Sequence, residues 1–380
     1  MFLCNDVLES KRQMGPINKV LIYRLGSIGD TVMALPALRL VARAFRYAER
    51  RVLTVFPDGA KVAPMDAVLG PLDLVHGYFR YPLKTRDPKT LVRLAQQIRS
   101  WGPEVLVYCA APRGRIKIFR DAFFFISCGI RRLIGVPWSR DLQACRKEQD
   151  GSLWESEAQR LLRCLAPLGN GMLESPAGWD LGLTAAERAK AEEVLAGWAG
   201  KDRFVCASIG TKAWVKDWGA DRWAEVFARF SHDKPGTGLV LVGSADEYEL
   251  SERLACAWHG PTLNVCGKLT PRESAAVMER AILFTGHDSG PMHLAAAVGK
   301  TCVAVFSARN LPGEWYPFGS RHRIFYHKTP CFGCRLVDGC PHEKKCIRSI
   351  TVEEVISAMN GIWEAETLNE RTYVWHRGSL

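Results

Sequence analysis

The sequence predicts an α/β protein made of two doubly wound domains that face each other across a cleft. Its 380 residues are too many for one ordinary core. Two successive series of short apolar runs alternate with amphipathic helical patterns, the signature of parallel sheets. A Gly- and Pro-rich stretch at 169–182 separates the series. We therefore expect an N-terminal domain at 1–175, a second domain at 176–350, and a C-terminal helix or tail at 351–380.

The first series begins with an apolar, β-prone run at 19–23, which predicts a buried strand. A glycine turn at 24–30 follows, and then apolar residues at helical spacing up to position 45. Further strands are predicted at 51–56, 104–108 and 132–136, with a helix over 88–100. Connections of this kind build a parallel sheet.

The second series begins with a capping-box pattern at 184–187, which predicts a helix that ends at Gly200. Strands are predicted at 204–208, 239–242, 283–285 and 301–306, and helices at 221–230, 271–280 and 291–298. Because ligands of doubly wound sheets bind at the carboxyl ends of the strands, we expect the site in the cleft between the domains.

The composition is globular, with 47% hydrophobic and 24% charged residues. Residues 1–165 hold 27 lysines and arginines against 15 acids, a net +12, and the remaining 215 residues sum to −1. A basic half favours an anionic partner, whether nucleic acid, an anionic lipid surface or a phosphorylated glycan, over a generically solvated surface. The longest apolar run, at 122–130, is too short to span a bilayer, which leaves a buried element or a membrane-dipping segment. The first residues lack a secretory-signal pattern, so we expect a cytoplasmic protein.

The first motif that indicates chemistry is Arg24-Leu-Gly-Ser-Ile-Gly-Asp30. Its two glycines allow a tight strand-to-helix turn and close approach of a ligand. Asp30 stands at the helix start, where it is either a capping acid or a carboxylate that faces the cleft. The spacing does not match the dinucleotide fingerprint G-x-G-x-x-G.

Two further motifs gather groups that bind phosphate. After the strand at 204–208, Thr211, Lys212 and Lys216 place a hydroxyl and two ammonium groups in one loop, which is either a phosphate site or a solvated surface loop. After the strand that ends at Thr285 come Asp288-Ser289-Gly290-Pro291-Met292-His293, a turn that opens a helix of small residues. The free N–H groups of such a helix start bind anions, and His293 lies one turn further on.

Four clustered cysteines, Cys331, Cys334, Cys340 and Cys346, follow the last predicted strand. Their spacing leaves three structural interpretations open: a zinc site, one or two disulfides, or reduced packing thiols. No D-x-D motif occurs in the chain, so a magnesium site of that type is not predicted. At the active site we expect no metal, and we expect no cofactor.

In this order and spacing, the turn at 24–30, the segment at Lys216 and Trp218 and the run at 288–297 resemble the lipopolysaccharide heptosyltransferases of glycosyltransferase family 9. The resemblance covers about residues 19–360. It implies the GT-B fold, with acceptor binding by the first domain, nucleotide-sugar binding by the second, and inverting transfer of heptose from an ADP-activated donor. It matches Asp30 to the catalytic carboxylate, with Lys216, Asp288, Ser289, Gly290 and His293 at the donor. Lys212 is an alternative to Lys216.

The predicted function is therefore metal-independent transfer of a sugar, heptose from ADP-heptose, onto a lipopolysaccharide core or a related envelope glycolipid. Glycosyl transfer needs a base for the acceptor hydroxyl and stabilisation of the departing diphosphate, which Asp30, Thr211, Lys216 and the helix start supply. The expected partners are an anionic glycolipid acceptor, a nucleotide sugar and the inner membrane surface, with no nucleic acid. The alternatives are a GT-B nucleotide-sugar epimerase and a basic nucleic-acid-binding protein, although no recognition motif supports the latter.

Overall fold

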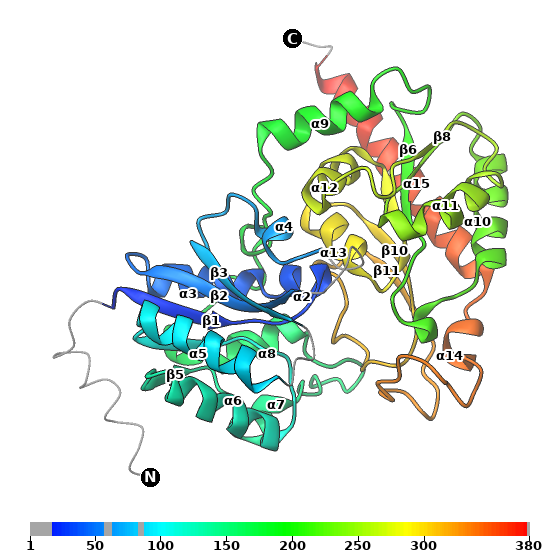
Figure 1. Cartoon of the computed structure of the whole chain (residues 1–380). Coiled ribbons are helices and arrows are strands. Elements are labelled where there is room, and N and C mark those ends of the chain that lie inside the picture. Colours follow the sequence, from blue (N-terminus) through cyan, green and yellow to red (C-terminus); the bar gives the residue numbers. More distant parts are fainter. Residues whose placement is uncertain (1–16, 57–62, 83–86, 378–380) are drawn as a thin grey trace.

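The computed structural model describes residues 17–56, 63–82 and 87–377. The prediction that the chain has no secretory signal concerns the first residues, which lie outside the described ranges. The chain forms two α/β halves with a connecting segment between them (Figure 1). This confirms the predicted fold class of two doubly wound domains.

The N-terminal sheet has five parallel strands in the order β3-β2-β1-β4-β5. Its strands are β1 (Lys19–Tyr23), β2 (Glu49–Phe56), β3 (Gly77–Pro82), β4 (Val105–Tyr108) and β5 (Arg132–Ile134). Its helices are α2 (Ile28–Met33), α3 (Leu35–Ala44), α4 (Asp66–Leu69), α5 (Pro88–Trp101), α6 (Arg115–Ser127), α7 (Arg140–Gln143) and α8 (Glu157–Cys164). The strand order reverses between β1 and β4, so the turn that follows β1 opens at a switch point, where such sheets bind ligands.

The C-terminal sheet has six parallel strands in the order β11-β10-β9-β6-β7-β8. Its strands are β6 (Phe204–Ser208), β7 (Gly238–Leu241), β8 (Thr262–Asn264), β9 (Leu283–His287), β10 (Cys302–Phe306) and β11 (Arg323–Tyr326). Its helices are α9 (Ala185–Leu195), α10 (Ala220–Asp233), α11 (Tyr248–Ala255), α12 (Pro271–Arg280), α13 (Gly290–Ala297), α14 (Lys345–Arg348) and α15 (Val352–Arg377). Here β6 and β9 flank the switch point, and the two phosphate-binding motifs follow these two strands.

The strands that the sequence pattern did not predict are β3, β8 and β11, and all three are edge strands. Each of the three contains polar or charged residues, so it lacks the continuous apolar run of a central parallel strand. The helix predicted from 184 to Gly200 was too long, because it ends at Leu195 where Ala196 turns extended at φ −62° and ψ 135°. Its predicted capping box, Thr184 with Glu187, is present.

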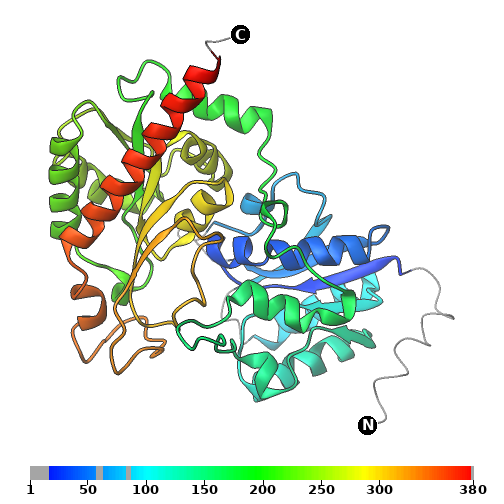
Figure 2. The ribbon, with the colours of Figure 1, turned by 180° about the vertical axis from the view of Figure 1, so that it is seen from behind.

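Helix α15 packs on the C-terminal domain, where it buries Val355, Met359 and Trp363 in the core formed with α10 and β9. Figure 2 shows this long helix running along the outer face of that half. Among the residues described, no helix has both the length and the apolar character needed to cross a bilayer.

Arg272 joins the two domains and the segment between them, and its side chain is 3% exposed. Its guanidinium donates to the carbonyl oxygen of Val68 in α4 at 3.1 Å and to those of Leu181 and Gly182 at 2.7 and 2.9 Å. It also pairs with the carboxylate of Glu187 in α9. One buried cation therefore fixes the connecting segment to both halves.

Candidate active site

A cavity of about 1070 Å³ lies between the domains, bounded by the turn after β1 on one side and by loops after β6, β7 and β9 on the other. All seven residues predicted from the sequence line it: Asp30, Thr211, Lys216, Asp288, Ser289, Gly290 and His293. Segments that are up to 263 positions apart along the chain are thus brought to one cavity, as expected for the carboxyl ends of facing doubly wound sheets.

Helices α2 and α13 both border this cavity and contact each other through two glycines. A Cβ on Gly29 would lie 3.0 Å from Cδ2 of His293, and a Cβ on Gly290 would lie 2.7 Å from the Cβ of Ile28. Only glycine lets the two backbones approach this closely. The sequence predicted that Asp30 faces the start of the helix after Thr285, and the contact between α2 and α13 places them so.

Asp30 is the third residue of α2, and its side chain is 27% exposed to the cavity. Its Oδ2 accepts the backbone N–H of Ser27 at 2.8 Å and the hydroxyl of Ser27 at 3.2 Å. This is the capping interaction that the sequence left as one of two alternatives. Oδ1 has no hydrogen bond to any residue of the described chain; its nearest charged neighbour is Arg24 at 3.8 Å. The carboxylate can therefore cap the helix and accept a proton at its second oxygen.

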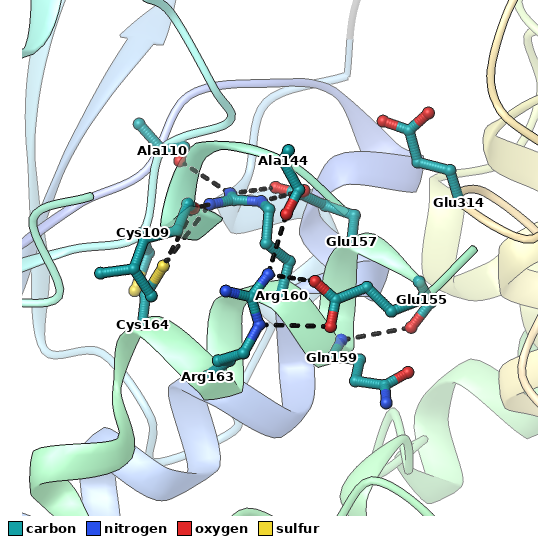
Figure 3. A network of polar contacts seen from close by, with 12 residues as sticks. Cys109, Ala110, Ala144, Glu155, Glu157, Gln159, Arg160, Arg163, Cys164 and Glu314 are labelled. Atoms are coloured by element: carbon teal, nitrogen blue, oxygen red, sulfur yellow. Dashed lines mark hydrogen bonds and ion pairs between the residues drawn. The ribbon is translucent and has the colours of Figure 1, made fainter. Parts of the chain in front are cut away.

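A buried charge network stands behind Asp30. Arg24 is 1% exposed, donates to the carbonyl oxygens of Cys109 and Asp30, and lies 3.7 Å from the carboxylate of Glu157. Figure 3 shows that carboxylate held by Arg160, whose Nε and Nη2 each lie 2.7 Å from a Glu157 oxygen. Charge-assisted bonds of this kind are strong and directional, so the network orients the turn that carries Asp30.

Lys216 and Asp288 form a buried ion pair at the floor of the cavity. Nζ of Lys216 lies 2.7 Å from Oδ2 of Asp288 and donates to its backbone carbonyl oxygen at 3.0 Å. His287 fixes the same loop, because its Nε2 accepts the backbone N–H of Trp218 at 3.1 Å and the indole N–H of Trp223 at 3.0 Å. Two donors at Nε2 require the ring proton to be on Nδ1.

Lys212 differs from Lys216 because no ion pair or hydrogen bond within the described ranges engages its ammonium group. It lines the cavity, and the surrounding walls lower its pKa by partial desolvation, while the nearby carboxylates of Asp30 and Glu247 raise it. An unpaired ammonium that faces a cavity is available to an anionic ligand. The two lysines left open by the sequence therefore have different surroundings: one is neutralised and one is unpaired.

Glu247 was not predicted from the sequence, yet its carboxylate lies at the carboxyl ends of β6 and β7. Burial raises the pKa of this carboxyl group, and one of its oxygens accepts the N–H of Ser244 at 2.8 Å. A Cβ at Gly210 or Gly243 would lie 1.7 or 2.1 Å from its oxygens, so both glycines make room for it. A carboxylate in this position suits hydroxyl donors such as those of a ribose.

The start of α13 is open to a ligand. No side chain caps it, and the Ser289 hydroxyl is buried without a hydrogen-bond partner in the described structure. The free N–H groups and the helix dipole favour an anion there. His293, 3% exposed, has its pKa lowered to about 4 by burial, so at neutral pH its imidazole is uncharged.

Thr211 turns the loop after β6 back on itself, since its hydroxyl lies 3.4 Å from both the N–H and the carbonyl oxygen of Ala213. The functional candidates missed by the sequence are of two kinds. Arg24 and His287 lie within or next to motifs already singled out, but only their hydrogen bonds in the folded structure show that they hold the site in place. Glu247 closes a capping box with Ser244, a local pattern that does not point to a cavity, and Glu157 belongs to no motif, so only the fold brings the two to the cavity.

The four clustered cysteines are free thiols, as are the other cysteines of the described chain. The Cys346 sulfur accepts the N–H of Ala308 at 3.4 Å, and Cys331 lies 3.5 Å from the hydroxyl of Thr329. Within the ranges described, no three His, Cys, Asp or Glu side chains are grouped so as to hold a metal ion.

Comparison with known proteins supports the assignment of the fold. A glycosyltransferase family 9 structure from Veillonella parvula covers 93% of this chain and 99% of its own, with a TM-score of 0.71 and 17% identity. The ADP-heptose lipopolysaccharide heptosyltransferase II of Escherichia coli covers 92% and 99%, with a TM-score of 0.65 and 17% identity. At these identities the likeness establishes the fold, that of the GT-B heptosyltransferases.

Sequence comparison identifies the family. Lipopolysaccharide heptosyltransferase 3 of Escherichia coli K12 is 28% identical over 167 residues, which are 42% of this chain and 46% of that protein. The chain thus spans about half the length of the curated relatives that it matches. The model of glycosyltransferase family 9 (heptosyltransferase) matches residues 118–345, more than half of the chain. The protein therefore belongs to glycosyltransferase family 9, the heptosyltransferase family.

Proposed function

We propose that this protein transfers a sugar, heptose from ADP-heptose, onto a lipopolysaccharide core or a related envelope glycolipid, with inversion at the anomeric carbon. The observation that carries the proposal is the position of Asp30 across the cavity from the start of α13. Family membership and the names of the relatives, a lipopolysaccharide heptosyltransferase and an ADP-heptose lipopolysaccharide heptosyltransferase, support the donor and acceptor class.

In the proposed reaction, the hydroxyl oxygen of the acceptor attacks the anomeric carbon of the donor, and Asp30 Oδ1 takes the proton of that hydroxyl. The bond from that carbon to the diphosphate oxygen breaks, and the nucleoside diphosphate leaves with the electron pair. General-base catalysis of this type contributes about 10²–10⁴-fold to the rate. Oδ2 stays bound to Ser27, which holds the carboxylate in place.

The chain's own residues supply positive charge for the departing diphosphate. The start of α13 offers N–H groups and the hydroxyl of Ser289, and Lys212 adds an unpaired ammonium group from the loop after β6. Lys216, whose charge Asp288 balances, stands on the same loop as a hydrogen-bond donor. Such preorganised donors stabilise developing charge without any bound cation. We therefore propose a metal-independent transfer that needs no cofactor besides the donor.

The acceptor would bind on the N-terminal side of the cavity. Residues 1–165 carry a net charge of +12, which suits a phosphorylated glycolipid. An acceptor of this kind belongs to a membrane, so the enzyme would act from the cytoplasm at the inner face of the inner membrane.

The test is a transfer assay with ADP-heptose and a heptose-deficient lipopolysaccharide core, read as ADP release and as the mass of the product. We expect Asp30→Asn to lower turnover at least about 100-fold while leaving the affinity for ADP unchanged. Asp202→Asn, an exposed acid before β6, is the matched control and should retain full activity. Undiminished turnover by Asp30→Asn would remove the base assignment. An isomerised free sugar formed without acceptor would show an epimerase instead.

The nucleotide is tested separately by thermal shift with ADP, UDP and GDP. A ligand held at 100 times its dissociation constant should add about 2.7 kcal/mol to the free energy of unfolding. We expect ADP to give the largest increase in Tm. A larger increase with UDP or GDP would reject ADP-heptose as the donor without affecting the family assignment.

A further inference from the structure

Helix α6 has two apolar faces, and only one of them is used by the fold. Ile118, Ala122 and Phe125 are buried against the N-terminal sheet. The other face exposes four large apolar side chains, here called the α6 stripe: Ile116 (86% exposed), Phe119 (55%), Phe123 (73%) and Ile126 (54%). These positions recur every three or four residues, so they lie along one side of the helix over about 15 Å.

Trp138, just before α7, extends the stripe. It is 46% exposed, and its ring centroid lies 5.6 Å from that of Phe119. Tryptophan and phenylalanine next to an exposed aliphatic row are typical of the interface between lipid headgroups and acyl chains. Figure 1 shows α6 and α7 at the outer edge of the N-terminal half.

The charges around the stripe are almost all positive. Residues 113–140 contain seven lysines and arginines and one acid, a net charge of +6. The acid, Asp121, is 6% exposed and already pairs with Arg113 and Arg120 at 3.1 and 2.7 Å. Arg115 and Lys117 are exposed on the helix itself. The segment therefore combines an exposed apolar stripe with exposed cations on the same helix.

The segment that carries the stripe is flanked along the chain by residues that line the active-site cavity. Ala111 and Pro112 line the cavity, and α6 begins three residues later at Arg115. On the other side of Trp138, residues 143–145 line the cavity again. Both ends of the segment that carries the stripe are therefore joined to residues of the cavity wall.

We infer that the α6 stripe and Trp138 dock this protein on an anionic phospholipid bilayer, with α6 lying in the plane of the interface. An amphipathic helix of this type buries its apolar face in the headgroup region while its cations bind anionic lipids. A second copy of this chain fits less well, because a two-fold contact would place the same basic segment of both copies together, each with a net charge of +6 over residues 113–140. The biological role of this docking rests on the proposed function, since docking would bring a lipid-anchored acceptor to the cleft.

The experiment is flotation of the full-length protein with vesicles of phosphatidylcholine alone or with phosphatidylglycerol added, in the absence of any donor. We expect binding to the anionic vesicles and little binding to the neutral ones. Phe119→Ser/Phe123→Ser should weaken binding at least about tenfold. Arg115→Gln and Lys117→Gln should each weaken it roughly fivefold, an effect that high salt would mimic.

The matched control is Tyr47→Ser/Val92→Ser, which removes two exposed side chains outside the stripe, one after α3 (83% exposed) and one on α5 (55% exposed). It should bind vesicles as the wild type does. All variants change exposed positions, so circular dichroism and Tm should match the wild type.

Binding of Phe119→Ser/Phe123→Ser at wild-type strength would overturn the inference, as would failure of the wild type to bind anionic vesicles. Sedimentation showing a wild-type dimer that the double variant dissociates would assign the stripe to self-association instead. Because no donor is present, vesicle binding can succeed even if the transfer assay fails. The two proposals can therefore fail separately.

Discussion

Nζ of Lys216 lies 2.7 Å from Oδ2 of Asp288, and both groups are largely buried at the cavity floor. The pair joins the loop after β6 to the turn after β9, the two strands that flank the switch point of the C-terminal sheet. The lysine assigned to the diphosphate is therefore already neutralised by the acid that the resemblance places at the donor. Lys212, on the same loop, has no such partner within the described chain.

This difference predicts distinct effects of removing the two lysines. Lys216→Ala leaves the carboxylate of Asp288 buried and unpaired, so we expect a loss of about 3 kcal/mol in the free energy of unfolding together with weaker ADP binding. Lys212→Ala removes an unpaired cation, so we expect weaker ADP binding with no loss of stability. Calorimetric titration with ADP and denaturant unfolding measure the two quantities. Equal stability of both variants would show that the ion pair does not contribute to the fold.

The close approach of α2 and α13 predicts that Gly290 cannot be replaced. In Gly290→Ala the new methyl would lie 2.7 Å from the Cβ of Ile28, so the domains must separate at the cavity. We expect a loss of about 1–3 kcal/mol in stability and reduced turnover. Gly361→Ala is the control: nothing lies within 4 Å of its new methyl, and alanine should stabilise α15 by about 0.5–1 kcal/mol. Tm and the transfer rate of both variants decide the point.

Burial of two histidines predicts acid sensitivity. The pKa values of His287 and His293 are each lowered by burial from 6.5 to about 4. Below pH 6.5 the unfolded chain binds protons that the folded chain does not, so the stability present above that pH is lost as the pH falls toward 4. We expect each histidine to contribute a slope of up to about 1.4 kcal/mol per pH unit.

The measurement is urea unfolding of the wild type and His293→Gln at pH 7 and pH 5. The variant should lose less stability between the two values than the wild type, because one of the proton-linked groups is gone. His259→Gln is the control and should follow the wild type. An identical loss in His293→Gln would exclude this histidine from the acid response.

The contacts of Arg272 predict a further effect on stability. Arg272→Ala removes the cation that bonds Val68, the connecting segment and Glu187, so several carbonyl oxygens lose their donor. We expect a loss on the order of 3 kcal/mol in the free energy of unfolding, measured with urea. Arg280→Ala, which removes an exposed ion pair of the same helix with Glu192, should cost under about 1 kcal/mol. A similarly small loss for Arg272→Ala would mean that the junction between the two domains and the connecting segment does not depend on this side chain.

The sequence alone determined the two doubly wound domains and the segments that meet at the cavity. Central strands such as β1 and β6 are buried on both faces, so they appear as uninterrupted apolar runs, and glycine turns and helix starts follow them at fixed positions. Those signals are local, and local spacing is sufficient to read them. The edge strand β11 gave no such signal, because solvent covers part of it.

Tertiary structure alone decided which charges are paired and which faces are covered. Lys212 and Lys216 are four positions apart and look alike in the sequence, but only the latter meets Asp288, 72 positions away. Arg24 acquires its place through Cys109, 85 positions away, Glu247 reaches the cavity only through the fold, and the apolar residues of α6 could all have been core. Whether a side chain is paired or exposed depends on which distant parts of the chain pack together, and the spacing of residues in the sequence does not determine this packing.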